Sequence, residues 1–342
     1  MKTPNKKELD QLIKQIEKDY GAGTVIKLDS NLKVDVDVIP TGLYSLDMAT
    51  GVGGFPRGRI VELYGPEGSG KTTLALSVVK ECQKAGGKAA YIDMENAMDV
   101  TYAKDKIGVD VGDLLFSQPN SAEEALGLVE KYAESKLVDL IVIDSVSSLV
   151  PRVEVEGEMG AQTMGLQARL MSHAMRKLVP IIKKSNTLVI FINQIRMKIG
   201  GSPYSNPEVT SGGKALLFAA SMRVDIRRIA WVKEGDRTVG SKVRAKITKS
   251  KVSAPFKAAE FCLMFDKGLW VANDLLETGL KYGVIEREGN TLSFGGEKIG
   301  VGLKASCSAL DGNPELCVRI AKELAMDGLT EVEERPTDSD DE

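Results

Sequence analysis

Short apolar segments alternate with amphipathic segments through the middle of the chain. The apolar runs have the length of buried strands, and the segments between them repeat apolar residues at helical spacing. The predicted strands are 59–64, 88–92, 114–117, 140–143 and 188–192, and the predicted helices are 72–85, 99–107, 121–135 and 163–184. This alternation predicts an α/β fold with a mostly parallel, twisted sheet covered by helices on both faces.

The two ends of the chain differ from this middle part. Residues 3–20 predict an amphipathic helix, and a short apolar segment follows at 24–28. The apolar face of this helix needs a partner surface, either in its own core or on a neighbouring subunit. Beyond the middle part, segments 224–232, 241–248 and 258–265 predict antiparallel strands that extend the sheet. We expect four parts: an N-terminal helix and strand (1–33), the sheet domain (34–268), a small α+β domain (269–328) and a disordered acidic tail (329–342).

Composition excludes several classes of protein. The 342 residues carry a net charge of −3, and no apolar run approaches the roughly 18 residues of a membrane helix. The first twenty residues lack the apolar core of a secretion signal. We therefore expect a cytoplasmic protein with no membrane partner. Four widely spaced cysteines predict free thiols, and the single histidine, His173, lies in a helical pattern typical of a surface position.

The charge is unevenly distributed. Residues 331–342 hold seven acids and one Arg, a net charge of −6, which leaves +3 on residues 1–330. Segment 214–251 alone contains eleven basic and three acidic residues. We expect the tail to compete with anionic ligands for basic surface, the simpler alternative being a solubilising tail.

The strongest chemical signal is Gly65-Pro66-Glu67-Gly68-Ser69-Gly70-Lys71-Thr72. It matches G-x-x-x-x-G-K-[ST] between a predicted strand and a predicted helix, which is the context this motif requires. Its glycines let backbone N–H groups point at phosphate oxygens, and the helix N-terminus adds positive potential. We expect Lys71 to contact the β- and γ-phosphates of a nucleotide and Thr72 to ligate Mg²⁺.

Polar residues that end neighbouring strands complete the predicted site. Asp144 is expected to hold the Mg²⁺ shell, directly or through water. Glu95 is expected to orient the attacking water, and Asp93 is the competing carboxylate with the shorter reach. The amides of Asn193 and Gln194 end another strand, where an amide can bond the γ-phosphate. Because parallel strands end at the same edge of a sheet, we expect these side chains to lie close together.

Two glycine-punctuated loops follow strands at this edge. One covers 154–163, and the other covers 195–211 and carries Arg196 and Lys198. Long loops of this kind are usually functional. With the helix residues Arg169 and Arg176 they could line a groove for single-stranded nucleic acid. Composition alone also allows solvated loops and an ordinary charged helix.

At these motifs the chain resembles the bacterial RecA recombinases. The resemblance rests on residues 65–73, 143–145, 186–200 and 254–257, and runs in one order from about residue 5 to about 325. It implies a DNA-dependent ATPase, using ATP and Mg²⁺, that forms a helical filament on single-stranded DNA and exchanges strands with homologous double-stranded DNA in repair. It also implies that the filament co-activates self-cleavage of a damage-response repressor.

The resemblance assigns roles by position. Glu95 is the water-activating residue and Gln194 the γ-phosphate sensor. Lys249 and Lys251 reach the nucleotide of the adjoining subunit, while Phe218 and the N-terminal element serve the subunit interface. The implied nucleotide contacts are Gly65, Pro66, Glu67, Gly68, Ser69, Gly70, Lys71, Thr72, Thr73, Asp144 and, at the adenine, Asp99 and Tyr102. The predicted DNA contacts, in and around loops 156–164 and 195–211, are Met164, Arg169, Ser172, Arg176, Arg196, Met197, Lys198, Ile199, Tyr204, Gly212 and Gly213.

Three other functions stay open on the sequence. A hexameric helicase or translocase shares the same core, although the N-terminal element favours an open filament. A small-molecule P-loop kinase would turn over without DNA and needs no pair of glycine-rich loops. A non-catalytic, nucleotide-gated DNA-binding protein would bind DNA without DNA-stimulated ATP hydrolysis.

Overall fold

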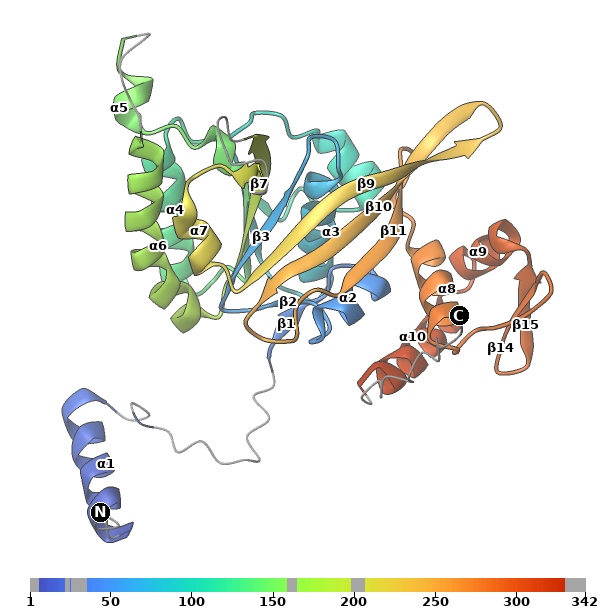
Figure 1. The fold of residues 1–342 in the computed structure, drawn as a ribbon, viewed down its shortest axis with the longest axis horizontal. Coiled ribbons are helices and arrows are strands. Elements are labelled where there is room, and N and C mark those ends of the chain that lie inside the picture. The colour runs from blue at the N-terminus through green and yellow to red at the C-terminus, as the bar shows by residue number, and fades with distance from the viewer. Residues whose placement is uncertain (1–5, 22–24, 26–35, 159–164, 198–206, 330–342) are drawn as a thin grey trace, which may run out of the picture. The chain divides into compact units, whose positions relative to one another are not determined.

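The computed structural model describes residues 6–21, 25, 36–158, 165–197 and 207–329 (Figure 1). The chain divides into two compact units, residues 1–36 and residues 37–342. In the first unit, helix α1 (Lys6–Tyr20) confirms the predicted amphipathic helix, and its Leu9 and Leu12 are exposed. Apart from Val25, the apolar segment predicted at 24–28 lies outside the described residues, as does the acidic tail from residue 330.

A ten-stranded sheet, counted over the described residues, forms the centre of the second unit. Its order is β12-β11-β10-β9-β3-β7-β6-β4-β5, and β8 pairs with β7. In the part of this order from β9 through β3 to β5, each strand is parallel to its neighbours. In the part from β9 to β12, each strand is antiparallel to its neighbours. The predicted parallel sheet with an antiparallel extension is therefore confirmed. The strands are β3 (Ile60–Gly65), β4 (Ala89–Asp93), β5 (Leu114–Ser117), β6 (Leu140–Asp144), β7 (Leu188–Met197), β8 (Glu208–Thr210), β9 (Met222–Glu234), β10 (Arg237–Ser250), β11 (Ala258–Met264) and β12 (Gly268–Leu269).

Helices cover both faces of this sheet (Figure 1). On β6, Leu140 and Val142 join the core beneath α3 (Lys71–Lys84), whereas Ile141 and Ile143 join the core that includes α4 (Ala122–Ser135) and α6 (Leu166–Ser185). Successive strand residues point to opposite faces, so a strand buried on both faces must be apolar throughout. This explains the continuous apolar runs in the sequence.

Four predicted segments need correction. Strand β7 runs to Met197 instead of ending at 192, because its last three residues pair with β8. The ends of the loop predicted at 195–211 therefore form a hairpin. A short helix, α5 (Arg152–Val155), occupies the start of the loop predicted at 154–163. The helix predicted at 99–107 is partly a π-helix, η1 (Tyr102–Ile107).

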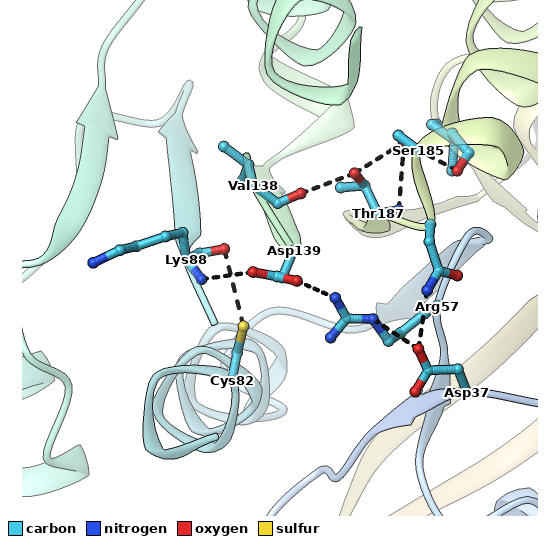
Figure 2. Close-up of polar contacts among 10 residues, drawn as sticks. Asp37, Arg57, Cys82, Lys88, Val138, Asp139, Ser185 and Thr187 are labelled. Carbon is cyan, nitrogen blue, oxygen red and sulfur yellow. Dashed lines mark hydrogen bonds and ion pairs between the residues drawn. The ribbon is translucent and has the colours of Figure 1, made fainter. Parts of the chain in front are cut away.

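A polar network joins the residues that precede the strands at their amino ends (Figure 2). Asp139 accepts a hydrogen bond from the backbone N–H of Lys88 at 2.8 Å and forms an ion pair with Arg57. Thr187 donates to the carbonyl oxygen of Val138 at 2.8 Å. These polar groups serve the fold, and the predicted chemistry lies at the other, carboxyl edge of the sheet.

A small α+β unit follows β12, in line with the sequence pattern. Its core receives Tyr44 and Met48 from α2 (Tyr44–Thr50), and Asp274 accepts a hydrogen bond from the N–H of Ser45 at 3.2 Å. Contacts with α2 thus hold this unit against the sheet domain. Its elements are α8 (Val271–Lys281), β13 (Glu286–Glu288), β14 (Thr291–Phe294), β15 (Glu297–Val301), α9 (Leu303–Asp311) and α10 (Pro314–Leu329). The remaining short elements are β1 (Val38–Ile39), β2 (Phe55–Pro56), η2 (Val146–Ser148) and α7 (Lys214–Ala219).

The cysteines and the histidine have the structural roles that the sequence predicts. All four cysteines are free thiols, and burial raises the pKa of Cys82 and Cys307 to about 11. His173 is exposed on α6. Among the residues that the structure describes, no helix is both long and apolar enough to cross a membrane.

Candidate nucleotide and DNA site

Strand β3 delivers the phosphate-binding motif to the start of α3. Gly65 ends β3 where a side chain does not fit, since a Cβ there would lie 2.1 Å from the carbonyl oxygen of Ile226 on β9. Lys71 is buried, and its ammonium donates to the carbonyl oxygens of Gly65 and Pro66 at 3.2 and 2.8 Å. Burial lowers the pKa of this lysine. The segment has the strand–loop–helix arrangement in which backbone amides and a lysine bind phosphates.

The buried hydroxyl of Ser69 is evidence for a phosphate ligand at this loop. The residue is only 1% exposed, and its Oγ has no hydrogen-bond partner among the described residues. A buried hydroxyl without a partner costs about 1–3 kcal/mol, and a phosphate oxygen would remove that cost. Glu67 and Gly68 beside it are exposed, so the loop is open to a ligand. These residues fit the phosphates of ATP.

Thr72 and Asp144 come together behind the loop. Thr72 Oγ1 donates to Asp144 Oδ2 at 2.8 Å, and the hydroxyl of Tyr91 donates to the same oxygen at 2.8 Å. Burial raises the pKa of Asp144, and the two hydrogen bonds oppose that rise. Hydroxyl, carboxylate and water oxygens are the ligands that Mg²⁺ prefers. The donor set therefore fits Mg²⁺.

The two candidate carboxylates after β4 have different surroundings. Asp93 is buried and accepts hydrogen bonds from the N–H groups of Glu95 and Met98 at 3.1 and 3.2 Å, which shape the following loop. Glu95 is exposed, and its Oε1 accepts from Ser145 Oγ at 2.5 Å and from Gln194 Nε2 at 2.9 Å. Among the described residues its second oxygen has no hydrogen-bond donor, so it is available to a water molecule, which favours Glu95 over Asp93.

Asn193 connects Gln194 to the end of the second predicted loop. The Asn193 side chain is fully buried, and its Oδ1 accepts the N–H of Gln194 at 2.9 Å. Its Nδ2 donates to the carbonyl oxygen of Ser211 at 3.1 Å. A displacement of Gln194 would therefore reach the segment that leads to Gly212 and Gly213.

The two residues predicted at the adenine lie beside α3. Asp99 Oδ1 accepts the backbone N–H of Tyr102 at 2.9 Å, and the Tyr102 hydroxyl lies 3.4 Å from Thr73 Oγ1. The first turn of η1 is thus attached to the phosphate-binding helix, with Tyr102 partly exposed.

Predicted DNA contacts gather on α6. Arg169, Ser172 and Arg176 are exposed and spaced by three and four residues, which puts them on one helix face. Gly213 packs against the start of the same helix, since a Cβ there would lie 2.9 Å from Ala168 Cβ.

Other predicted DNA contacts follow the sheet edge. Arg196 and Met197 are exposed at the end of β7, and a Cβ at Gly212 would lie 2.8 Å from Val146 Cγ1 of η2. Met164, Lys198, Ile199 and Tyr204 lie outside the described residues.

The two lysines predicted to act on a neighbouring subunit bind the end of α7. Lys249 donates to the carbonyl oxygens of Leu217 and Phe218 at 2.7 and 3.0 Å, and Lys251 donates to that of Phe218 at 3.1 Å. The negative end of a helix favours such cations. The Phe218 side chain is 66% exposed beside them. Lysines and phenylalanine thus form one surface.

Several partners of the site residues were not among the predicted site residues. Tyr91 bonds Asp144 and Ser145 bonds Glu95, yet hydroxyls near strand ends are too common to signal this. Glu62 stands out in the sequence as a charge inside an apolar strand, and the structure buries it completely. Its partner Arg223 is 161 positions away, and only the sheet register joins them.

The chain is similar along most of its length to proteins of one known family. The family model of the RecA N-terminal domain matches residues 7–270, and that of the RecA C-terminal domain matches residues 273–327. Protein RecA of a Nitratiruptor species is 51% identical over 324 residues, covering 95% of this chain and 94% of that protein. Protein RecA of Wolinella succinogenes is 48% identical over 337 residues, covering 98% and 96%.

A solved structure shows the same fold. The RadB recombinase superposes with a TM-score of 0.51 at 24% identity, covering 68% of this chain and 98% of that one. With near-complete relatives at about half identity and both RecA domain models matched, the chain belongs to the RecA family.

Proposed function

We propose that this RecA-family recombinase is a DNA-dependent ATPase that forms a helical filament on single-stranded DNA and exchanges strands with homologous duplex DNA. One observation carries the proposal. Gln194, which donates to Glu95 at 2.9 Å, lies on the strand that continues into Arg196 and Met197. The candidate water-activating carboxylate and the candidate DNA contacts are therefore joined by one short segment.

The described side chains divide the work of hydrolysis. Lys71 neutralises charge on the β- and γ-phosphates, and Thr72 and Asp144 would hold the Mg²⁺ ion. When bound, Mg²⁺ shields the phosphate oxygens and offsets the charge that develops on the leaving group. Glu95 accepts a hydrogen bond from the attacking water and aims its oxygen at the γ-phosphorus. Ser145 keeps the Glu95 carboxylate in place.

Gln194 supports a coupling between nucleotide and DNA. Its amide donates to Glu95 in this structure, and a γ-phosphate oxygen is a competing ionised acceptor. A turn of Gln194 towards that phosphate releases Glu95 for the water and shifts the end of β7. The residues next in line, Arg196 and Met197, are proposed DNA contacts, so ATP and DNA would favour the same conformation.

Assembly is proposed to complete the site. Lys249 on β10 lies opposite Arg223 on β9, and Arg223 lies opposite Glu62 in the amino half of β3. The phosphate loop follows the carboxyl end of β3. The lysines therefore lie away from their own nucleotide, which supports action on the neighbour's. Phe218 and the N-terminal element of residues 1–33 are proposed to make the other subunit contacts.

Two further roles follow from the resemblance alone. We propose that the active filament co-activates self-cleavage of a damage-response repressor and that the protein works in the cytoplasm. Neither depends on a site residue named above.

Electron microscopy with single-stranded DNA and a slowly hydrolysed ATP analogue tests the assembly, together with a strand-exchange assay. We expect open helical filaments and exchange of homologous strands. Closed rings without exchange would support the hexameric helicase or translocase instead. That function and the small-molecule kinase are not favoured, because matches to both RecA domains span the chain.

A further inference from the structure

A buried charge pair lies between the two parts of the ATPase machinery carried by one subunit. Glu62 on β3 is fully buried, and its carboxylate accepts from Arg223 Nε at 2.5 Å and from Asn193 Nδ2 at 2.9 Å. A buried ion pair is a weak source of stability, because desolvation offsets most of the attraction. A hydrophobic pair would fold this strand equally well, so the charges call for another role.

One side of the pair leads to the nucleotide. Asn193 uses its other polar contacts to hold the N–H of Gln194 and the carbonyl oxygen of Ser211. Any movement of Gln194 upon contact with a γ-phosphate therefore reaches Glu62 through a single side chain.

The other side leads to the lysines that serve the neighbouring subunit. Arg223 is the direct cross-strand partner of Lys249, and its guanidinium lies 4.4 Å from the ring centre of Tyr64. The Tyr64 hydroxyl is 2.9 Å from Thr248 Oγ1, which fixes β10 next to Lys249. Burial, Lys251 and Arg223 lower the pKa of Lys249 to about 8, and the charge of Glu62 opposes this.

We infer that Glu62 is a positioning residue that, through Arg223, holds Lys249 and Lys251 for the neighbouring subunit and, through Asn193, links them to the γ-phosphate sensor of its own subunit. The inference rests on the proposed function. It makes the occupancy of one ATP site a determinant of the lysine geometry at the next, so hydrolysis along a filament is cooperative.

The double variant Glu62→Gln/Arg223→Gln tests this without leaving a charge unpaired. Removing both charges is expected to keep the thermal midpoint near that of the wild type, and the amide oxygen introduced on β3 can still accept from Asn193. We expect DNA-independent ATP binding to be unchanged and DNA-stimulated kcat to fall about tenfold or more. The Hill coefficient for ATP should fall towards 1. The matched control is Arg244→Gln/Glu260→Gln, an exposed Arg–Glu pair of the same sheet, which should hydrolyse ATP normally.

Mixed filaments separate positioning from a merely structural role. Each site takes Glu95 from one subunit and the lysines from the next, so mixing the double variant with inactive Glu95→Gln protein gives its Glu95 wild-type lysines. We expect more hydrolysis than from the two proteins assayed separately. Should the double variant not fold, Arg223→Lys keeps the charge pair and is mixed in the same way. A wild-type rate in the variant, or no gain on mixing, would overturn the inference. Absence of DNA-stimulated hydrolysis in the wild type would instead overturn the proposed function.

Discussion

At the scale of single residues, burial and hydrogen bonding separate side chains of the same type. Asp93 and Glu95 are both carboxylates at the end of β4, but Asp93 is buried and bonded to loop amides, whereas Glu95 is exposed. Two lysines differ in the same way. Lys71 is buried beneath the phosphate loop, whereas Lys251 is exposed and donates to the carbonyl oxygen of Phe218 in α7. The role proposed for each of these side chains therefore follows from its burial and hydrogen bonds more than from its residue type.

The Glu95→Gln variant tests that separation. It keeps the size of the side chain and its contact with Ser145, but loses the charge that polarises the water. We expect ATP and DNA to bind as in the wild type and hydrolysis to slow about 10²- to 10⁴-fold. Single-turnover hydrolysis alongside DNA binding by fluorescence anisotropy measures both. Loss of nucleotide binding would show that Glu95 has a structural role. The comparison variant is Asp93→Asn, which removes the charge of the buried carboxylate at the end of the same strand.

Residue type and local context predicted part of this site. The phosphate loop, Asp144 and Gln194 each stand at the end of an apolar run, and a parallel sheet places such ends together. The charge of Glu62 inside an apolar strand is visible in the sequence, but its partner Arg223 lies 161 residues away, and Ser145 bonds Glu95 from 50 residues away. No local pattern encodes pairings over such distances.

At the scale of elements, α6 and the segment leading into α7 pack together on the proposed DNA side. Gly212 and Gly213 approach η2 and α6 so closely that added Cβ atoms would clash, and α7 then presents its carbonyls to Lys249. The proposed DNA contacts and the proposed interface lysines thus lie at the two ends of a six-residue helix. A shift of α7 would be felt at both.

The Gly213→Ala variant tests this packing, with Gly302→Ala as its matched control. Gly213 has φ 74° and ψ −163°, and Gly302 has φ 80° and ψ 159°, but only at Gly213 would an added Cβ have a neighbour within 4 Å. We expect the control to lose about 1–3 kcal/mol of unfolding free energy, because this backbone region strains any residue with a Cβ, and Gly213→Ala to lose more. Gly213→Ala should also bind single-stranded DNA more weakly. Chemical denaturation and anisotropy measure these quantities, and equal losses in the two variants would refute the packing argument.

Element boundaries were predicted less well than element types. The apolar pattern ended at residue 192, yet β7 continues to Met197 because β8 pairs with it. Four of the five residues that extend β7 are polar or exposed, the exception being Ile195, so periodicity carries no clear signal of their strand conformation. The pairing of β7 with β8 therefore determines where β7 ends.

At the scale of the whole molecule, two buried carboxylates lie where the small C-terminal unit meets the sheet domain. Asp47 of α2 accepts the N–H of Thr41 at 2.8 Å, and Asp274 of α8 bonds Ser45. Burial raises the pKa of Asp47 to about 8 and that of Asp274 to about 6. Both values lie above the roughly 3.9 of an unfolded Asp, so the folded state binds more protons between these limits.

This difference predicts the pH dependence of stability. The contribution of each protonated carboxyl is complete below about pH 4 and is lost as the pH rises through the folded pKa, at about 6 and about 8. Thermal unfolding midpoints should therefore fall from pH 5 to pH 8 more steeply in the wild type than in Asp47→Asn. The variant should be the more stable protein at pH 8. Parallel profiles would show that Asp47 does not titrate in this window.

We propose above all that DNA controls ATP hydrolysis at the carboxyl edge of the sheet. The ATP hydrolysis rate of the wild type and of Lys71→Ala, measured with and without single-stranded DNA, tests this. We expect a low wild-type rate that rises strongly when DNA is added, and a rate near background for Lys71→Ala in both conditions. A wild-type rate that does not respond to DNA, or a Lys71→Ala protein with normal DNA-stimulated hydrolysis, would contradict it.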